Sequence, residues 1–178
     1  MLLVRRAVAF AVDWVLLFLV LAPVGQLVRL GLGWPTPSTG PGVWLVIALN
    51  MSLPTWTYFT LSDSSARGAT AGKRLLGLSV VRVDGGRVEL GRALGRTAIK
   101  LLPWETVHVS LFALSSDPTR FAPRQWVGLA VANTLMVAYL VVAAWTRGRR
   151  SVHDYATKTE VRSSPAWGAG VGMGRRPG

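Results

Sequence analysis

Four long stretches of apolar residues alternate along the chain with segments rich in charge, glycine and proline. The stretches cover residues 7–28, 43–61, 97–116 and 126–145. A helix needs about 20 apolar residues to cross the hydrocarbon core of a bilayer. The third stretch is the most polar, because it contains Lys100, Pro103 and two further titratable residues. The pattern predicts an all-α membrane protein, a bundle of four transmembrane helices.

The first stretch resembles a signal peptide in its basic start, but it is too long for one and contains Asp13. It also lacks a cleavage site of the A-x-A type, so we expect it to remain as a helix. The chain has no cysteine, which excludes disulfides and thiolate metal sites.

The positive charge is distributed unevenly around these stretches. Of the 20 lysines and arginines, only Arg29, Arg120 and Arg124 fall in the two outer loops, and the other 17 lie on the inner side. Such a bias places both termini in the cytoplasm. Each basic residue near a membrane contributes about 1 kcal/mol to binding anionic lipids, so lipid contact explains the net charge of +12 better than nucleic acid does.

Several basic residues are placed to meet lipid headgroups. A short interfacial helix is predicted over residues 71–76, and the last apolar stretch is followed by a basic segment. The side chains near a predicted span end can extend toward the headgroups. The headgroup candidates are Lys73, Arg74, Arg96, Lys100, Arg149 and Arg150. The alternative for Arg96 and Lys100 is that either one balances Asp13 or Glu105.

The inner loop contains a turn signal between two β-prone runs. Residues 78–90 read LSVVRVDGGRVEL, and glycines after an aspartate favour the positive φ angles of a tight turn. This pattern predicts a short β-hairpin within the basic cytoplasmic loop. Residues 163–178 are rich in glycine, proline and arginine, which predicts a disordered basic tail.

Asp13 is the residue of the first stretch whose burial in a membrane costs the most free energy. A charged residue at that depth must be paired, neutral or used in transport. Arg6 lies on the same helical face, but about 10 Å away along the axis, which makes a direct pair within the helix unfavourable. Arg6 therefore extends to the headgroups or to another segment. A structural partner and a place in an ion or proton path both remain open for Asp13.

Glu105 and His108 are neighbours on a helix, three residues apart. The pair could relay protons, form a structural polar cluster, or supply half of a Glu-x-x-His metal site. The only other histidine, His153, lies in the inner tail, so no metal is expected.

No sequence motif indicates catalysis. No serine lies in a G-x-S-x-G elbow, and GATAGKR (68–74) lacks the spacing of a phosphate loop. We expect neither an enzyme nor a cofactor.

Three blocks resemble the RDD family of membrane proteins, which is named for one arginine and two aspartates. The blocks are RRAVAFAVD, the inner GATAGKRLLGLSVVRVDGGRVELGRALGR, and the closing RGRRSVHDYATKTEV. By this resemblance Arg6, Asp13 and Asp154 match the three named residues, and Thr159 matches a threonine that follows. Ala71 replaces a common proline, and Tyr155 stands where an arginine is frequent.

The resemblance implies an RDD-like transmembrane domain over residues 1–162, in a multi-pass protein of the bacterial inner membrane. For some members a transport role, including sodium/proton exchange, has been proposed. We expect Arg6 and Asp154 to form an ion pair that holds the tail on the first helix. Asp13, Glu105 and His108 would form a deeper polar cluster.

Two functions remain open on this basis. The first is a small cation/proton exchanger, as a homo-oligomer, in which Asp13 and Glu105 alternate between proton and cation. The second is a non-transporting scaffold or assembly factor that binds anionic lipids or a membrane protein partner.

Overall fold

The computed structural model describes residues 2–115 and 121–164. It is mostly helical, with one two-stranded sheet. The helices, with η for π-helical turns, are α1 (Leu2–Gly31), α2 (Gly40–Ile47), η1 (Ala48–Ser52), α3 (Leu53–Ser64), α4 (Ala71–Leu75), α5 (Leu90–His108), η2 (Val109–Ala113), α6 (Pro123–Trp145) and α7 (Val152–Ala156). The strands are β1 (Leu78–Arg82) and β2 (Thr159–Ser163).

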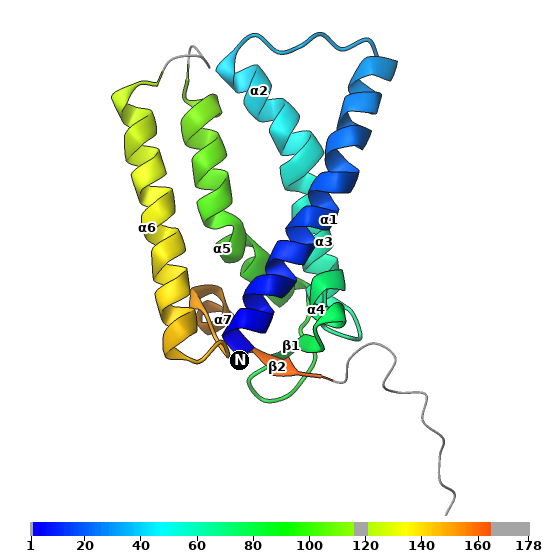
Figure 1. Ribbon diagram of the computed structural model, residues 1–178, viewed down its shortest axis with the longest axis vertical. Helices are drawn as coiled ribbons and strands as arrows, with labels where there is room; N and C mark the ends of the chain where they lie inside the picture. Colours follow the sequence, from blue (N-terminus) through cyan, green and yellow to red (C-terminus); the bar gives the residue numbers. More distant parts are fainter. Residues whose placement is uncertain (1, 116–120, 165–178) are drawn as a thin grey trace, which may run out of the picture.

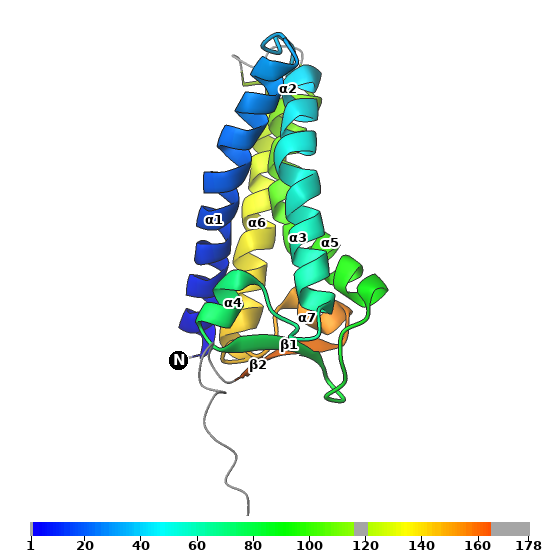
Figure 2. The ribbon, with the colours of Figure 1, turned by 90° about the vertical axis from the view of Figure 1, so that its right-hand side faces the viewer.

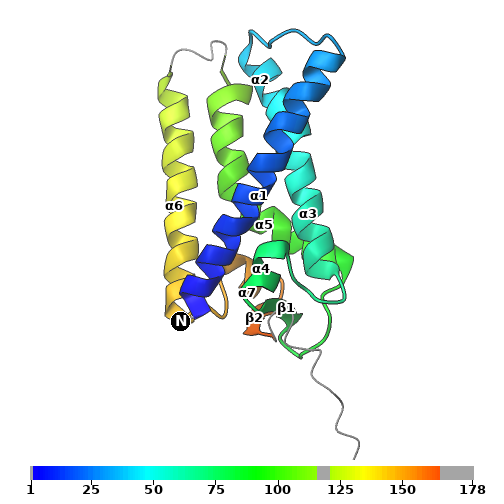
Figure 3. The same ribbon diagram turned by 45° about the vertical axis from the view of Figure 1, so that its right-hand side comes forward.

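The long helices lie side by side as rods (Figures 1 and 3). Helices α2 and α3 form one continuous rod through η1, and α5 continues into η2 in the same way. Each apolar stretch is thus helical as predicted, although the helix of the third stretch ends at Ala113. Helices α1 and α6 are each long and apolar enough to cross a membrane.

The short elements gather at one end of the rods, beside the N-terminus (Figures 1 and 2). We call this end, made by the start of α1 with α4, α7, β1 and β2, the charged end. Its core is a small apolar cluster that contains Leu78, Val80, Val88 and Val161. Between the rods, Leu17, Phe59 and Leu101 form a second cluster.

The predicted β-hairpin is wrong. The turn at residues 84–86 forms, with the Gly86 amide donating to the Asp84 carboxylate, but the chain after it does not become a strand. Strand β1 pairs instead with β2 from the end of the domain, antiparallel and with Val80 opposite Val161. Val88 enters the apolar core and α5 begins at Leu90, which leaves too few residues for a returning strand.

The end of β2 also shortens the predicted tail. Ser163 is the last residue of that strand, so the segment predicted to be disordered begins with ordered structure. Residues 165–178 lie outside the described part of the chain.

Helix α4 packs directly against α1 because residue 72 is a glycine. A Cβ atom at Gly72 would lie 2.1 Å from the carbonyl oxygen of Ala9, closer than any real contact. The close approach lets the Gly72 amide donate a 2.8 Å hydrogen bond to Asp13.

We expect Gly72→Ala to lower the free energy of unfolding by about 1–3 kcal/mol, the usual cost of overpacking a fixed site. The measurement is the thermal unfolding midpoint of the protein in detergent micelles. Gly91→Ala is the control, because a Cβ there meets nothing within 4 Å and alanine favours helix by up to about 1 kcal/mol. Equal stability of the Gly72 variant and the wild type would contradict the tight α1–α4 contact.

Candidate functional site: a buried charge network

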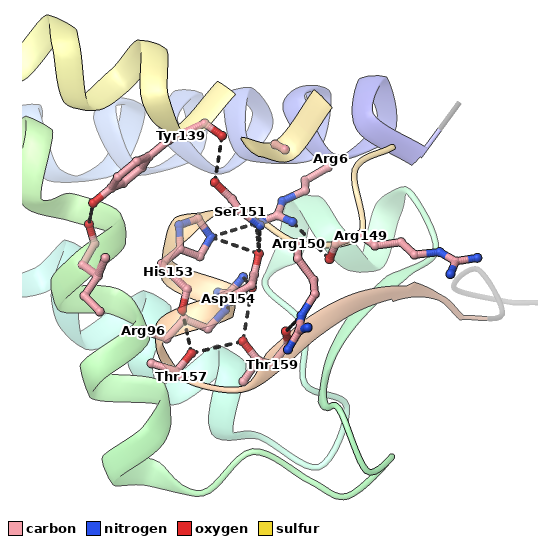
Figure 4. A network of polar contacts seen from close by, with 12 residues as sticks. Arg6, Arg96, Tyr139, Arg149, Arg150, Ser151, His153, Asp154, Thr157 and Thr159 are labelled. Atoms are coloured by element: carbon pink, nitrogen blue, oxygen red, sulfur yellow. Dashed lines mark hydrogen bonds and ion pairs between the residues drawn. The ribbon is translucent and has the colours of Figure 1, made fainter. Parts of the chain in front are cut away.

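Asp154 is the centre of a polar cluster at the charged end (Figure 4). Its side chain is fully buried, and Ser151 at the start of α7 donates its amide to Oδ2 at 2.8 Å. Ser151 itself donates its hydroxyl to the Tyr139 carbonyl at 2.9 Å, which fixes α7 on α6. The turn Ser151–Asp154 therefore holds the carboxylate inward by local helix-capping geometry.

Two arginines from distant helices neutralise Asp154. Arg6 from α1 forms an ion pair with Oδ2. Arg96 from α5 donates to Oδ1 through Nε at 3.0 Å, and its Nη2 lies 2.9 Å from the same oxygen in an ion pair. Thr159 adds a hydroxyl hydrogen bond to Oδ1 at 3.2 Å. The expected Arg6–Asp154 pair thus forms, and Thr159, the family-like threonine, contacts the same carboxylate.

Arg96 extends the network to a second carboxylate. It is 1% exposed and pairs with Asp63 at the end of α3 as well as with Asp154. Asp63 also pairs with Lys73 from α4. Charges of alternating sign therefore link α1, α7, α5, α3 and α4, in the order Arg6, Asp154, Arg96, Asp63, Lys73.

Asp13 lies beside this network but is held by neutral donors. Its Oδ1 accepts from the Tyr58 hydroxyl at 2.6 Å and the Gly72 amide at 2.8 Å, and Oδ2 accepts from the Thr70 hydroxyl at 2.6 Å. The side chain of Thr70 also caps α4 by accepting from the Lys73 amide at 3.3 Å. In the T-x-G-K segment, the threonine and glycine thus hold Asp13, and the lysine holds Asp63.

Glu105 and His108 do not join Asp13. Glu105 accepts from the Trp56 indole at 2.9 Å and from the Ser52 hydroxyl at 3.1 Å. His108 bonds through Nδ1 to the Trp104 carbonyl at 2.8 Å. The expected cluster of Asp13, Glu105 and His108 is therefore wrong, because each side chain is satisfied by its own neighbours. Within residues 2–115 and 121–164 no three Asp, Glu or His side chains are grouped to hold a metal.

The headgroup candidates divide into buried and accessible residues. Lys73 and Arg96 are buried in ion pairs, so the expectation that they meet lipid headgroups does not fit their placement. Lys100 lies over the Phe59 ring, with Nζ 3.2 Å from the centroid. Arg74 donates to the Ala69 carbonyl at 3.0 Å.

Arg149 and Arg150 flank the network without entering it. Arg149 is exposed, and its side chain points away from Asp154 in Figure 4. Arg150 donates to the Thr159 carbonyl at 3.1 Å and lies over the Tyr155 ring. A headgroup role for Arg149 stays a prediction.

Asp63 is the functional residue that the sequence analysis missed. It follows the second apolar stretch in a Ser-Asp-Ser run that resembles an ordinary helix end. One signal was available: Arg96 and Lys100 needed a carboxylate partner, and Asp63 lies at the matching end of the neighbouring rod. Only the contact between α3 and α5 identifies it.

Opposite effects set the pKa values of the adjacent residues His153 and Asp154. Burial raises the pKa of Asp154, but the guanidinium groups of Arg96 and Arg6 outweigh it and hold the pKa well below its ordinary value. Burial holds the pKa of His153 well below its ordinary value, so the ring is neutral. Arg6 lies 2.7 Å from Nε2, which must accept, and the proton is therefore on Nδ1.

Removal of one partner from a buried ion pair strongly destabilises a fold. Arg96→Gln would leave two buried carboxylates short of a cation, and we expect it to cost about 3–5 kcal/mol of folding free energy. Arg82→Gln is the matched control, since Arg82 also bridges two carboxylates, Asp84 and Glu89, but at the surface. Its loss should cost far less, because ion pairs at the surface contribute little to stability. Denaturant titration in micelles measures both, and equal losses would contradict the buried network.

Because the buried His153 ring is neutral, we expect the stability of the fold to decrease in acid. Because its pKa is lower in the folded state than in the unfolded chain, the unfolded chain binds the extra proton as the pH falls below about 6.5. The thermal unfolding midpoint should therefore decrease from pH 7 to pH 5, and His153→Gln should reduce that dependence. His108→Gln serves as the control, because it removes the other histidine, which lies outside the network. An unchanged pH dependence in His153→Gln would refute the assignment.

The comparison with models of protein families agrees with the three blocks of resemblance. The comparisons with curated proteins and with solved structures returned no match. The model of the RDD family matches residues 2–158, which include Arg6, Asp13 and Asp154. The chain belongs to the RDD family.

Proposed function

We propose that the chain is a multi-pass protein of the bacterial inner membrane, with four spans and both termini in the cytoplasm. Family membership and the two long apolar helices support a membrane protein. The α2–α3 and α5–η2 rods run alongside these helices and supply the other two spans (Figure 1). The charged end, which holds β2 and the start of α1, corresponds to the side to which the sequence pattern assigns 17 of the 20 basic residues.

Within the membrane, the protein acts as a non-transporting scaffold rather than as an ion exchanger. The observation that carries this proposal is the saturation of its buried carboxylates. Asp154 and Asp63 each pair with two cations, and Asp13 accepts three hydrogen bonds. An exchanger needs a carboxylate that alternates between proton and cation. Release of Asp63 or Asp154 would break buried ion pairs, and release of Asp13 would break its three hydrogen bonds.

One observation favours the exchanger as a second candidate. Asp13 has only neutral donors and contributes to the lining of a cleft between the helices. A carboxylate without a fixed cation can take up a proton or a small cation more readily than a paired one. Asp13 is therefore the residue on which the two functions differ.

Flux measurements decide between them. We expect purified protein in proteoliposomes to show no proton flux above empty vesicles when sodium, potassium or lithium is added across a pH gradient. Cation-dependent flux that disappears in Asp13→Asn and persists in Asn133→Asp would establish the exchanger instead. Asn133 lines the same cleft from α6, so its variant controls for a change of charge there.

The proposed topology has its own test, because the chain has no cysteine. We expect single cysteines at Ser38, in the loop between α1 and α2, and at Ala156, in α7, to react oppositely with an impermeant maleimide. Both positions are exposed. Ser38→Cys should be labelled in spheroplasts, and Ala156→Cys only after lysis. Labelling of Ala156→Cys in intact spheroplasts would overturn the cytoplasmic assignment.

A further inference from the structure

A cleft of about 660 Å³ opens between α1 and α6. The two helices approach each other at the charged end and diverge toward the other end (Figures 1 and 3). Phe10, Trp14 and Phe18 from α1 form one wall of the cleft, and Met136 and Leu140 from α6 form the opposite wall. All five side chains are apolar, and the volume lies in the usual range of about 300–1,000 Å³ for small-molecule sites.

The floor of the cleft has the opposite character. Arg6, Lys73, Lys100, Ser151 and His153 line it where α1 meets the charge network. The cleft is therefore polar and basic at the charged end and apolar toward the middle of the rods. An inner-leaflet phospholipid has the same order along the same axis, with its phosphate at the cytoplasmic side and its acyl chains toward the bilayer centre.

Lys100 gives the floor one basic side chain more than it has carboxylates. The network and its neighbours contain four cations, Arg6, Lys73, Arg96 and Lys100, against the carboxylates of Asp13, Asp63 and Asp154. Lys100 contacts the Phe59 ring, and in the described part of the chain it has no carboxylate within ion-pair distance.

A second donor on the floor lacks a partner. Nδ1 of His153, which carries the ring proton, has no hydrogen-bond acceptor among the described residues. A charge or donor without a partner is costly, and a phosphate oxygen in the cleft satisfies an ammonium such as that of Lys100. The charge of the floor is thus complementary to an anion.

We propose that this cleft binds one anionic phospholipid of the inner leaflet, with its phosphate at Lys100 and an acyl chain between α1 and α6. The inference deepens the scaffold function and rests on its topology, which puts the charged end in the cytoplasm. A net negative headgroup balances the surplus charge, whereas a zwitterionic headgroup brings its own cation. The site should therefore select lipids by the charge of the headgroup as well as by contact with the acyl chain.

Native mass spectrometry of the delipidated full chain tests the headgroup. The probes are phosphatidylglycerol and phosphatidylcholine with identical acyl chains. We expect one molecule of phosphatidylglycerol to bind at least about tenfold more tightly, a difference that one charge-assisted contact can supply. Lys100→Gln should remove most of that preference. Lys158→Gln, which removes a lysine charge from an exposed position at the same end, should retain it.

A second pair of variants tests the contact with the acyl chain of the lipid. Met136→Trp fills the cleft and should weaken binding of both lipids at least about tenfold, whereas Val137→Trp, on the exposed neighbouring face of α6, should not. Equal affinity for the two lipids, or equal effects of the matched variants, would overturn the inference. If the protein forms dimers that Met136→Trp dissociates and Val137→Trp does not, the cleft is occupied by a second copy of the chain. That result would also overturn the inference. Cation flux with intact lipid selectivity would overturn only the scaffold function.

Discussion

The pairing of Arg96 with two carboxylates is the constraint on which the charged end depends. A guanidinium that is 1% exposed must have its charge balanced and its donors satisfied inside the protein. Asp63 and Asp154 do both, and they come from elements far apart in the sequence. The ion pairs thus fix where α3 ends against α5, and where the tail turn of α7 docks. Arg6 and Lys73 complete the balance from α1 and α4.

The polar contacts of α1 are concentrated at the charged end. At the charged end, Arg5 donates to the Leu76 and Gly77 carbonyls, Arg6 binds the tail, and Asp13 binds α4. Beyond Trp14, the polar contacts of α1 with the other rods give way to apolar packing, and α1 diverges from α6. The cleft is a consequence of this arrangement, with charge at its base and apolar walls above.

The sequence predicted what depends on local pattern and on single strong pairs. Apolar runs of membrane length identified the helices, and Arg6 with Asp154 was identified from family-like positions. Partners that depend on tertiary contact were missed. Asp63 has an unremarkable local setting, and β1 carried a good hairpin signal but pairs with β2, because Val88 is needed in the core. Glu105 and His108 were correctly placed on one helix, yet each found a closer neighbour than Asp13.

Asp13 contributes its negative charge as well as its hydrogen bonds. Arg6, Arg96 and Lys73 outnumber Asp63 and Asp154 by one, and the Asp13 carboxyl group makes the two numbers equal. An asparagine could keep its oxygen at the Oδ1 position and accept from Tyr58 and Gly72. Its amide nitrogen would then face the Thr70 hydroxyl that now donates to Oδ2, and the network would lose one of its acidic side chains. With Asp13 included, acidic and basic side chains of the network are equal in number, and Lys100 alone remains without a carboxylate partner to attract an anion from the membrane.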